Sequence, residues 1–217
     1  MTYKHVVQAN QEDDESKVPF FPIDKRKPYK HFEQTLQFQH IHFYISEDIV
    51  EPDAYIEMIY RIQNSSPNDT IYIHLNTPGG QLDTGVQIIN AIQNSPAKVI
   101  TVLEGMAYSL GTLIFLAGDE LVVNDHCIMM FHNFRGGVVG KGNEITLQLE
   151  ATVKWFTELA KQIYVPFLSD DEFNRLLKGE DIWMMSEEVR ARLENMIKIK
   201  SEEKKKSPRK KKDNTPS

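Results

Sequence analysis

The sequence contains a single cysteine in 217 residues, no long apolar run and no internal repeat. One cysteine, Cys127, excludes an intrachain disulfide and fits a reducing compartment, which favours a cytoplasmic location. Without an apolar stretch of about 20 residues, no transmembrane helix is expected. The N-terminus also lacks the apolar core of a signal peptide. We therefore expect a cytoplasmic protein that does not insert into a membrane.

Two frequent cofactor patterns are missing as well. The histidines and carboxylates do not show a metal-ligand spacing such as His-Glu-x-x-His. The phosphate-binding pattern Gly-x-x-x-x-Gly-Lys-Ser/Thr is also absent. The sequence therefore predicts that the chain requires no metal and has no ATP site of its own.

The charge is distributed unevenly along the chain. Residues 198–217 contain nine Lys/Arg and three Asp/Glu, which leaves a net charge of −12 on residues 1–197, although the whole chain carries −6. An acidic body makes general nucleic-acid binding an unlikely function class. The basic tail has no apolar periodicity, so we expect residues 198–217 to be disordered.

The rest of the chain divides into an arm and a body. Residues 1–37, interrupted by prolines, are expected to form a flexible arm with a short strand near 18–21. Residues 38–197 alternate strand and helix patterns, which is typical of an α/β fold with a largely parallel sheet. Strands are expected at 40–45, 71–75, 99–103, 121–123 and 128–131, and helices from 53, at 84–93, at 109–117 and at 144–165.

The helix expected at 144–165 is the longest in the chain. Apolar residues recur along it in steps of three and four, which marks an amphipathic face. This face consists of Ile145, Leu149, Val153, Phe156, Ala160 and Ile163. Packing on another subunit and packing in the core of the same chain are equally compatible with the pattern.

A serine stands between small residues in the segment Gly105-Met106-Ala107-Tyr108-Ser109-Leu110-Gly111. The expected strand before Ser109 and the helix after it place this residue in a tight turn at a helix N-terminus, where N–H groups favour negative charge. A nucleophilic serine needs such a place, together with a base and a group that orients the base. Taken alone, the segment is better explained as a turn whose serine caps the helix.

The segment Asn76-Thr77-Pro78-Gly79-Gly80 follows the strand expected at 71–75. Paired glycines let a backbone approach a ligand and direct N–H groups at it, although an ordinary turn has the same composition. An acyl-transfer enzyme needs backbone donors beside the developing oxyanion. The N–H groups of Gly80 and of Leu110, the residue after the serine, are candidates for this role.

His132 ends an apolar strand and is the candidate base, with a structural core histidine as the alternative. His126 competes with it but precedes the strand, whereas sites on parallel sheets form at the carboxyl ends of strands. Beyond His132, the stretch through Gly136, Gly137 and Val138 has little side-chain cover. A peptide substrate can lie against such a backbone as an added strand.

Asp181 follows Gly179 and precedes the apolar run 182–185, which is expected to be buried. An aspartate at the edge of such a run is a candidate for orienting His132 through Nδ1. A helix cap or turn cap is the alternative for the same residue.

With these segments in view, the chain resembles the proteolytic subunit of the Clp protease, the ClpP family of serine peptidases, over roughly residues 38–190. Four family motifs occur here in order. They are Asn-Ser-Pro-Gly-Gly, with Thr77 in place of the serine here, Gly-x-Ala-x-Ser-x-Gly, Met-x-His-x-x-x-Gly-Gly-x-x-Gly and Asp-x-Phe/Trp-Met, which fall on 76–80, 105–111, 130–140 and 181–184.

The resemblance implies a role for each residue of the site. Ser109 would be the nucleophile, His132 the general base and Asp181 the group that orients the base. Gly80 and Leu110 would form the oxyanion hole, and Gly79 and the segment from Gly136 to Val138 would contact the substrate. The implied fold is of the ClpP/crotonase type, with repeated ββα units, a mostly parallel sheet and a protruding handle helix.

The implied function is that of a self-compartmentalising serine endopeptidase. Members of the family form heptameric rings, usually two stacked as a tetradecamer, and hydrolyse unfolded polypeptides that an AAA+ unfoldase delivers. The unfoldase, not this subunit, uses the ATP. The helix at 144–165 would then lie between two rings.

The sequence departs from the family at several positions. Asn133-Phe134 replace the usual Gln-Pro, which alters the wall of the substrate groove, and Glu180 replaces an arginine that helps two rings lock together. The alternatives are a catalytically silent ring subunit that assembles with active paralogues, a crotonase-type enzyme acting on acyl-CoA thioesters, and a Ser–Lys peptidase. A complete Ser–His–Asp set disfavours all three.

Overall fold

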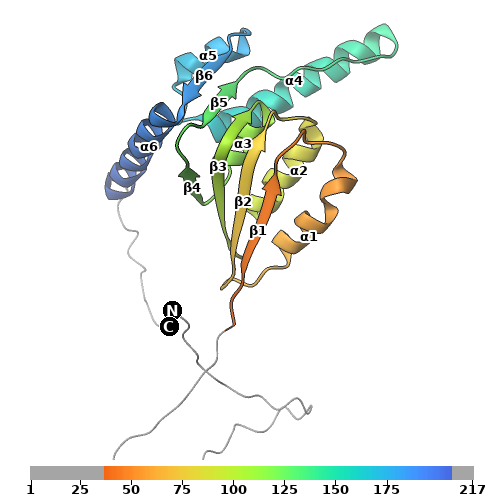
Figure 1. Ribbon diagram of the computed structural model, residues 1–217. Helices are drawn as coiled ribbons and strands as arrows, with labels where there is room; N and C mark the ends of the chain where they lie inside the picture. Colours follow the sequence, from red (N-terminus) through yellow and green to blue (C-terminus); the bar gives the residue numbers. More distant parts are fainter. Residues whose placement is uncertain (1–36, 207–217) are drawn as a thin grey trace, which may run out of the picture. The chain divides into compact units, whose positions relative to one another are not determined.

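The computed structural model describes residues 37–206, with side chains described through Lys198. The chain divides into two compact units, Met1–Gln39 and His40–Ser217, and the fold below is that of the second. Its centre is a six-stranded sheet in the order β1-β2-β3-β5-β6, with β4 paired to β3 (Figure 1). The short strand expected near 18–21 lies outside the described residues.

The sheet is mostly parallel. β1 (His40–Ile45), β2 (Thr70–Thr77), β3 (Lys98–Tyr108), β4 (Glu120–Val123) and β5 (Ile128–Phe131) pair in parallel. Only β6 (Ile182–Met185) is antiparallel, to β5. Because the parallel strands run the same way, their carboxyl ends lie along one edge of the sheet.

β3 is the longest strand and has two successive neighbours on one side. Its first half pairs with β4, from Ile100 to Leu103, and its last residues pair with β5, from Met106 to Tyr108. We expected this strand to end at residue 103, but it continues to Tyr108. The residues expected in a turn, Gly105 and Ala107, therefore lie within the strand.

Three helices cover one face of the sheet. They are α1 (Ile56–Gln63), preceded by the 3₁₀ turn η1 (Pro52–Tyr55), α2 (Leu82–Gln93) and α3 (Leu110–Leu116) (Figure 1). In β2, Ile71, Ile73 and Leu75 point to this face and are fully buried, as the two-residue period of a strand requires. Burial of these apolar side chains holds the helices on the sheet.

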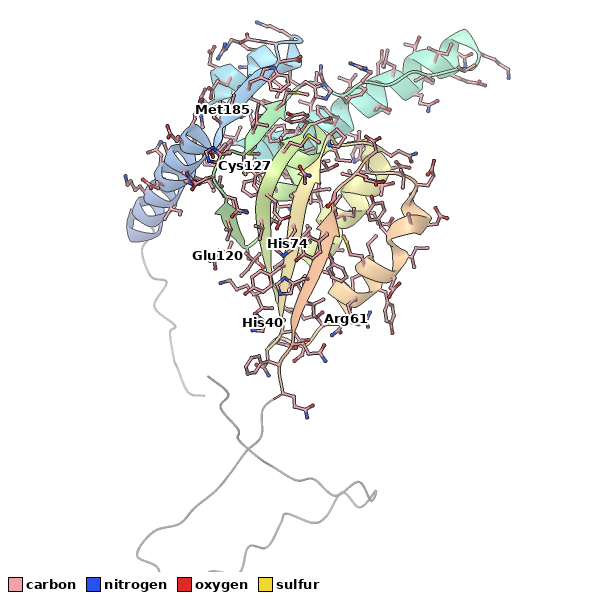
Figure 2. The ribbon with its side chains drawn as sticks, in the orientation of Figure 1. His40, Arg61, His74, Glu120, Cys127 and Met185 are labelled. Atoms are coloured by element: carbon pink, nitrogen blue, oxygen red, sulfur yellow. The ribbon has the colours of Figure 1, made fainter. Side chains whose placement is uncertain are left out.

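The opposite face of β1 and β2 carries a row of stacked rings. Tyr72 stacks on His42 with ring centroids 4.5 Å apart, and Tyr44 stacks on His74 at 4.3 Å. His42 Nδ1 lies 3.0 Å from His74 Nε2, and His74 Nδ1 lies 2.7 Å from Glu104 Oε1. Figure 2 shows His74 on this face of the sheet. Cross-strand pairs of this kind stabilise the β1–β2 ladder.

α4 (Gly142–Tyr164) extends beyond the sheet (Figure 1). Its C-terminal half packs on the body through Phe156, Ala160 and Tyr164, which are buried. In its N-terminal half, Leu149 and Val153 expose 47% and 44% of their surface. The expected apolar face is therefore split, with one half covered by the chain itself and the other half uncovered within the described residues.

The C-terminal part contributes α5 (Asp170–Leu177), β6 and α6 (Ser186–Lys206). The run 182–185 is not buried as expected, because alternate side chains of β6 face away from the core. Trp183 is 52% and Met185 61% exposed, whereas Met184 is buried. The tail boundary at residue 198 also differs from the structure, in which α6 continues to Lys206. The predicted boundary between the arm, residues 1–37, and the body, residues 38–197, stays a prediction.

The predicted fold class is confirmed, an α/β fold with a mostly parallel sheet and a protruding helix. Most predicted elements occur within a few residues of their expected ends. α5 was not expected, although Ser169 and Glu172 form a reciprocal cap at its start, with the Glu172 N–H donating to Ser169 Oγ at 3.2 Å.

A partly buried ion pair joins α5 to α6. Arg192 donates to Glu172 through two nitrogens, at 2.9 and 2.7 Å, and also to Glu188 at 2.8 Å. The Arg192 guanidinium, aided by the cap at Ser169, lowers the pKa of Glu172 from an ordinary 4.5 to about 2. A carboxylate with a lowered pKa stabilises the fold above pH 4.5, and this contribution is lost as the pH falls toward 2.

We predict that Glu172→Gln lowers the free energy of unfolding at pH 7 by about 1–3 kcal/mol, because a two-pronged charged contact is lost. The difference from the wild type should shrink as the pH falls below 4.5. The measurement is urea unfolding followed by circular dichroism between pH 3 and 7. Glu180→Gln, which removes the exposed partner of Arg175, should cost less than about 1 kcal/mol. Equal costs for both variants would contradict this assignment.

Candidate active site

Ser109 has an unusual backbone conformation. It follows β3 and precedes α3, with φ 52° and ψ −118°, and only one other described non-glycine residue, His126, has a positive φ. Such a conformation costs a side-chain-bearing residue on the order of 1–3 kcal/mol, and it clusters at functional sites. A serine on a sharp turn between a strand and a helix presents its Oγ free of the backbone, as a nucleophile requires.

Backbone hydrogen bonds hold this turn. The Ser109 N–H donates to the Met130 carbonyl at 2.8 Å, which ties the end of β3 to β5. The Ser109 carbonyl accepts from the Thr112 N–H at 3.0 Å and from Thr112 Oγ1 at 2.6 Å. Thr112 Oγ1 also contacts the hydroxyl of buried Tyr164 at 2.7 Å. The turn is thus anchored to a strand on one side and to α4 on the other.

The small residues around Ser109 allow the 76–80 loop to approach. A Cβ on Gly105 would stand 2.5 Å from Asn76 Oδ1, and one on Gly111 would stand 2.9 Å from Thr77 Cγ2. Asn76 Oδ1 instead accepts a hydrogen bond from the Met106 N–H at 3.2 Å. The pattern Gly-x-Ala-x-Ser-x-Gly therefore leaves room for this loop against β3 and α3.

Gly79 and Gly80 have different surroundings. Gly79 is buried, its N–H donates to Thr77 Oγ1 at 3.1 Å, and its carbonyl accepts from the Ile49 N–H at 2.8 Å. Gly80 lines the same pocket as Ser109, and its N–H has no partner among the described residues. Leu110 also lines this pocket and begins α3, where the first N–H groups lack partners within the helix. These two N–H groups suit the predicted oxyanion hole.

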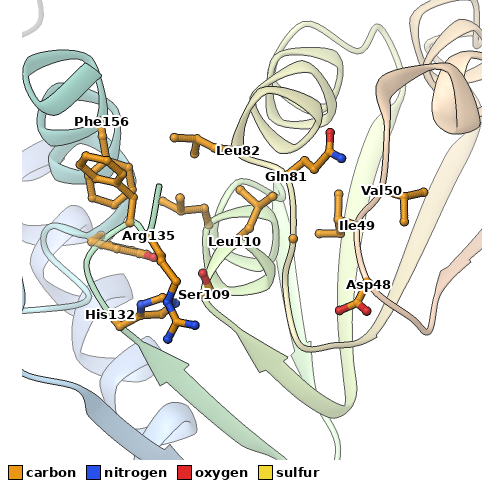
Figure 3. A pocket seen from close by; sticks show the side chains of 14 residues that line it. Asp48, Ile49, Val50, Gln81, Leu82, Ser109, Leu110, His132, Arg135 and Phe156 are labelled. Carbon is orange, nitrogen blue, oxygen red and sulfur yellow. The ribbon is translucent and has the colours of Figure 1, made fainter. Parts of the chain in front are cut away.

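His132 follows the last residue of β5 and lines the pocket with Ser109. Because Tyr108 pairs with Met130 in parallel, Ser109 and His132 emerge at the same edge of the sheet. Figure 3 shows both side chains at the same part of the pocket. His126 is exposed, has φ 62° and does not line the pocket. The geometry therefore favours His132 over His126.

Asp181 and His132 lie just beyond the paired residues of β5 and β6. Phe131 faces Ile182 in antiparallel register, so His132 and Asp181 form the next facing pair beyond the last one. Facing residues lie about 4.5–5.5 Å apart at Cα and on the same side of the sheet. Asp181 is exposed, does not line the pocket and has no hydrogen bond to His132 within residues 37–206. The structure thus places Ser109 and His132 in one pocket, and Asp181 lies outside the lining of that pocket.

Apart from Leu110 and Phe134, the pocket has walls that sequence reasoning did not assign. Apolar side chains from several elements surround Ser109, and Asp48 and Arg135 are charged residues at its sides (Figure 3). Phe134 and Arg135 lie two and three residues after His132. Their closeness to the candidate base in the sequence was the signal that could have placed them in the pocket. Asp48, Ile49 and Val50 reach the site only through the parallel bridge of Ile49 to Gly80, which no local pattern indicates. The apolar walls are Ile49, Val50, Leu82, Leu110, Leu113, Phe134 and Phe156.

The residues expected to contact the substrate lie on the segment that leads to α4. Gly136 and Gly137 are exposed, Val138 is half-buried, and none of the three lines the pocket. This segment is not a strand, and its N–H groups from Arg135 to Gly140 have no hydrogen-bond partner among the described residues. An irregular backbone with unused donors and acceptors can pair with an added peptide strand.

Neither metal ligands nor a membrane span is found in the described part of the chain. No group of three or more His, Cys, Asp and Glu within residues 37–206 could hold a metal ion. None of the helices there is both long and apolar enough to cross a membrane. The predicted absence of a cofactor remains a prediction.

Comparison with known proteins identifies relatives of this chain. The sequence profile of the Clp protease family matches residues 25–191. The ATP-dependent Clp protease proteolytic subunit of Bacteroides thetaiotaomicron is 27% identical over 140 residues, which cover 62% of this chain and 61% of the relative. The protein of the same name from Ostreococcus tauri is 28% identical over 98 residues, covering 44% and 48%. The chain therefore matches less than two thirds of the length of either relative.

The close approach at Gly79 gives a test of the turn. A Cβ there would lie 2.8 Å from the Tyr108 carbonyl oxygen and 3.0 Å from Ser109 Cβ, at φ 97°. We predict that Gly79→Ala lowers the free energy of unfolding by at least about 2 kcal/mol, because backbone strain and crowding add. Hydrogen exchange at the Ser109 amide should accelerate, since the turn must shift.

The matched control is Gly142→Ala at the start of α4, where an added Cβ meets nothing within 4 Å. Alanine favours a helix, so this variant should be neutral or slightly stabilising. Equal stability and equal Ser109 exchange in both variants would show that Gly79 does not support the turn.

Proposed function

The chain belongs to the Clp protease family, and on that premise we propose that it is a serine endopeptidase that hydrolyses peptide bonds of unfolded polypeptides. One observation carries the proposal. Ser109 occupies a strained turn between β3 and α3 and shares a pocket with His132, the residue that follows the neighbouring strand β5. This arrangement of a serine and a histidine is what acyl transfer requires.

In the proposed reaction, Ser109 Oγ attacks the scissile carbonyl carbon while an imidazole nitrogen of His132 accepts its proton. The N–H groups of Gly80 and Leu110 stabilise the resulting oxyanion. His132 then protonates the departing amine, and water hydrolyses the acyl-serine in a second, equivalent step. Asp181 would move to within hydrogen-bond distance of the His132 ring and orient it. These roles are supported by the shared pocket and by the β5–β6 register.

A substrate peptide would lie along residues 135–140. The unused N–H groups of this segment support the proposal, because a strand added to them would satisfy both backbones. Gly136 and Gly137 let the two backbones approach, and Val138 offers one side chain of contact. The buried loop at Gly79 would support the site from behind rather than touch the substrate.

The proposed partners are copies of the same chain and an AAA+ unfoldase. The relatives are proteolytic subunits of an ATP-dependent protease, whereas this sequence has no phosphate-binding loop. ATP would therefore be used by the unfoldase. We propose heptameric rings, stacked as a tetradecamer, in the cytoplasm. The exposed half of α4 supports such assembly, because its apolar side chains are costly to leave in water.

We predict that Ser109→Ala and His132→Ala each lower kcat/KM for a fluorogenic peptide at least about a thousandfold, because the two residues act as a unit. Asp181→Asn should lower it about 10⁴-fold, because the amide favours the wrong tautomer of His132. Peptide hydrolysis by the purified chain, with folding checked by circular dichroism, is the measurement.

His126→Asn and Glu180→Gln are the matched controls. Asparagine tolerates the positive φ of His126, and Glu180 pairs with Arg175 instead of facing His132. Both variants should retain most of the activity. Loss in His126→Asn with retention in His132→Ala would refute the choice of base. A wild type as inactive as Ser109→Ala would favour the silent ring subunit.

The assembly proposal requires a variant that spares the core. Phe156 belongs to the apolar face expected for α4, but it is buried, packs on Phe134 and lines the pocket. We therefore predict that lysines at Leu149 and Val153, which are exposed, reduce the particle mass in sedimentation from stacked rings to smaller species.

Lysines at Gln148 and Ala151, which are exposed and lie off the apolar stripe, add the same charge and should leave the mass unchanged. A wild type that sediments as a monomer at micromolar concentration would overturn the assembly proposal. Equal changes in particle mass for the Leu149/Val153 pair and the Gln148/Ala151 pair would also overturn it.

A further inference from the structure

The pocket contains one cation without a counterion. Its charged or ionisable lining residues are Asp48, His132 and Arg135, together with the buried hydroxyl of Tyr164. Arg175, Arg190 and Arg192 each form an ion pair with a carboxylate, and Arg61 also has a partner. Arg135 is the exception within residues 37–206, because it has neither a hydrogen bond nor an ion pair there.

The segment that carries Arg135 is fixed on its N-terminal side. The Asn133 side chain donates to the Leu177 carbonyl at 3.1 Å, and the Phe134 N–H donates to Asn133 Oδ1 at 2.9 Å. The Phe134 ring packs on Phe156 of α4, with centroids 5.1 Å apart. The guanidinium therefore extends from a fixed base three residues after His132, on the same side of the pocket (Figure 3).

Apolar side chains form another part of the pocket wall. Leu82, Leu113 and Phe156 line the pocket and offer surface to a hydrocarbon stem. Asp48, the acidic residue of the lining, lies on the opposite side of Ser109 in Figure 3. A ligand group that is apolar along its length and anionic at its end fits this distribution, because the guanidinium binds carboxylates with two parallel hydrogen bonds.

We propose that Arg135 binds a carboxylate of the substrate beside Ser109 and makes the enzyme prefer bonds flanked by glutamate or aspartate. The inference rests on the proposed peptidase function and names its substrate class. The carboxylate comes either from an acidic side chain next to the scissile bond or from the free carboxyl end of the peptide. Both sources place the same group on the same guanidinium.

The overall charge of the chain does not produce this preference. Residues 1–197 carry a net −12, so the general field repels acidic peptides. A preference for a carboxylate must then come from a local contact, and removal of one guanidinium should abolish it. Charge-assisted hydrogen bonds that the neutral isostere cannot form give about a 10- to 100-fold difference in kcat/KM.

The test compares blocked, internally quenched peptides that differ at one central residue, Glu, Gln or Lys, in an otherwise apolar sequence. The full-length enzyme is compared with Arg135→Gln, Arg135→Glu and Lys98→Gln. Lys98 lies at the opposite end of β3 from the site, so this control removes one positive charge without touching the pocket. A second pair of Gln peptides ends in a free carboxylate or an amide, and mass spectrometry locates the cleaved bond.

We expect the wild type and Lys98→Gln to cleave the Glu peptide about 10- to 100-fold more efficiently than the Gln peptide, beside the glutamate. The ratio should fall to about one in Arg135→Gln, and Arg135→Glu should favour the Lys peptide. If the wild type instead prefers the Gln peptide with a free C-terminal carboxylate over its amide, the bound carboxylate is that of the peptide's C-terminus.

A ratio near one in the wild type, or a preference that persists in Arg135→Gln, would overturn the proposal. If Ser109→Ala abolishes peptide cleavage in that case, the proposed peptidase function is retained and only the proposed role of Arg135 is rejected. Cleavage at the wild-type rate by Ser109→Ala would remove the proposed function and this inference together.

Discussion

The hydrogen bond from the Ser109 N–H to the Met130 carbonyl, 2.8 Å long, joins the ends of β3 and β5. It belongs to the last pair of the parallel ladder, Tyr108 with Met130, and ties down the backbone of Ser109, which has φ 52°. Packing of the 76–80 loop against the turn offsets this backbone strain. The packing is close because glycines stand where a Cβ would collide with the neighbouring segment. The position of His132, two residues after Met130, follows from the same ladder. The proposed nucleophile and its proposed base would therefore be placed by strand pairing, not by flexible loops.

Much of this arrangement could be predicted from the sequence. Strand-like segments predicted β1 and β5 at their observed ends, and the order of strands and helices indicated a parallel sheet. Since parallel strands end at one edge, Ser109 and His132 could be expected to meet. The choice between His132 and His126 depended on this reasoning and on the family motif at 130–140, and only His132 lines the pocket.

The remaining features depend on contacts between distant segments. The sequence predicts that β3 ends at residue 103, because Glu104 and Gly105 interrupt its apolar run. In the structure, pairing with β5 extends the strand to Tyr108. The run 182–185 looks buried by composition, but an antiparallel edge strand exposes Trp183 and Met185. The apolar face of α4 gives no sign of where the body ends, and so Phe156 could not be separated from Val153. Ile49 reaches the pocket only through its bridge to Gly80.

The most direct test of the central claim is reaction of the purified chain with a fluorophosphonate, followed by mass mapping of the adduct. A serine activated by His132 should form one phosphonyl ester, on Ser109, and His132→Ala should slow its formation by orders of magnitude. Absence of an adduct, an adduct on another serine, or equal labelling of Ser109 with and without His132 would contradict the assignment of this turn as a catalytic nucleophile.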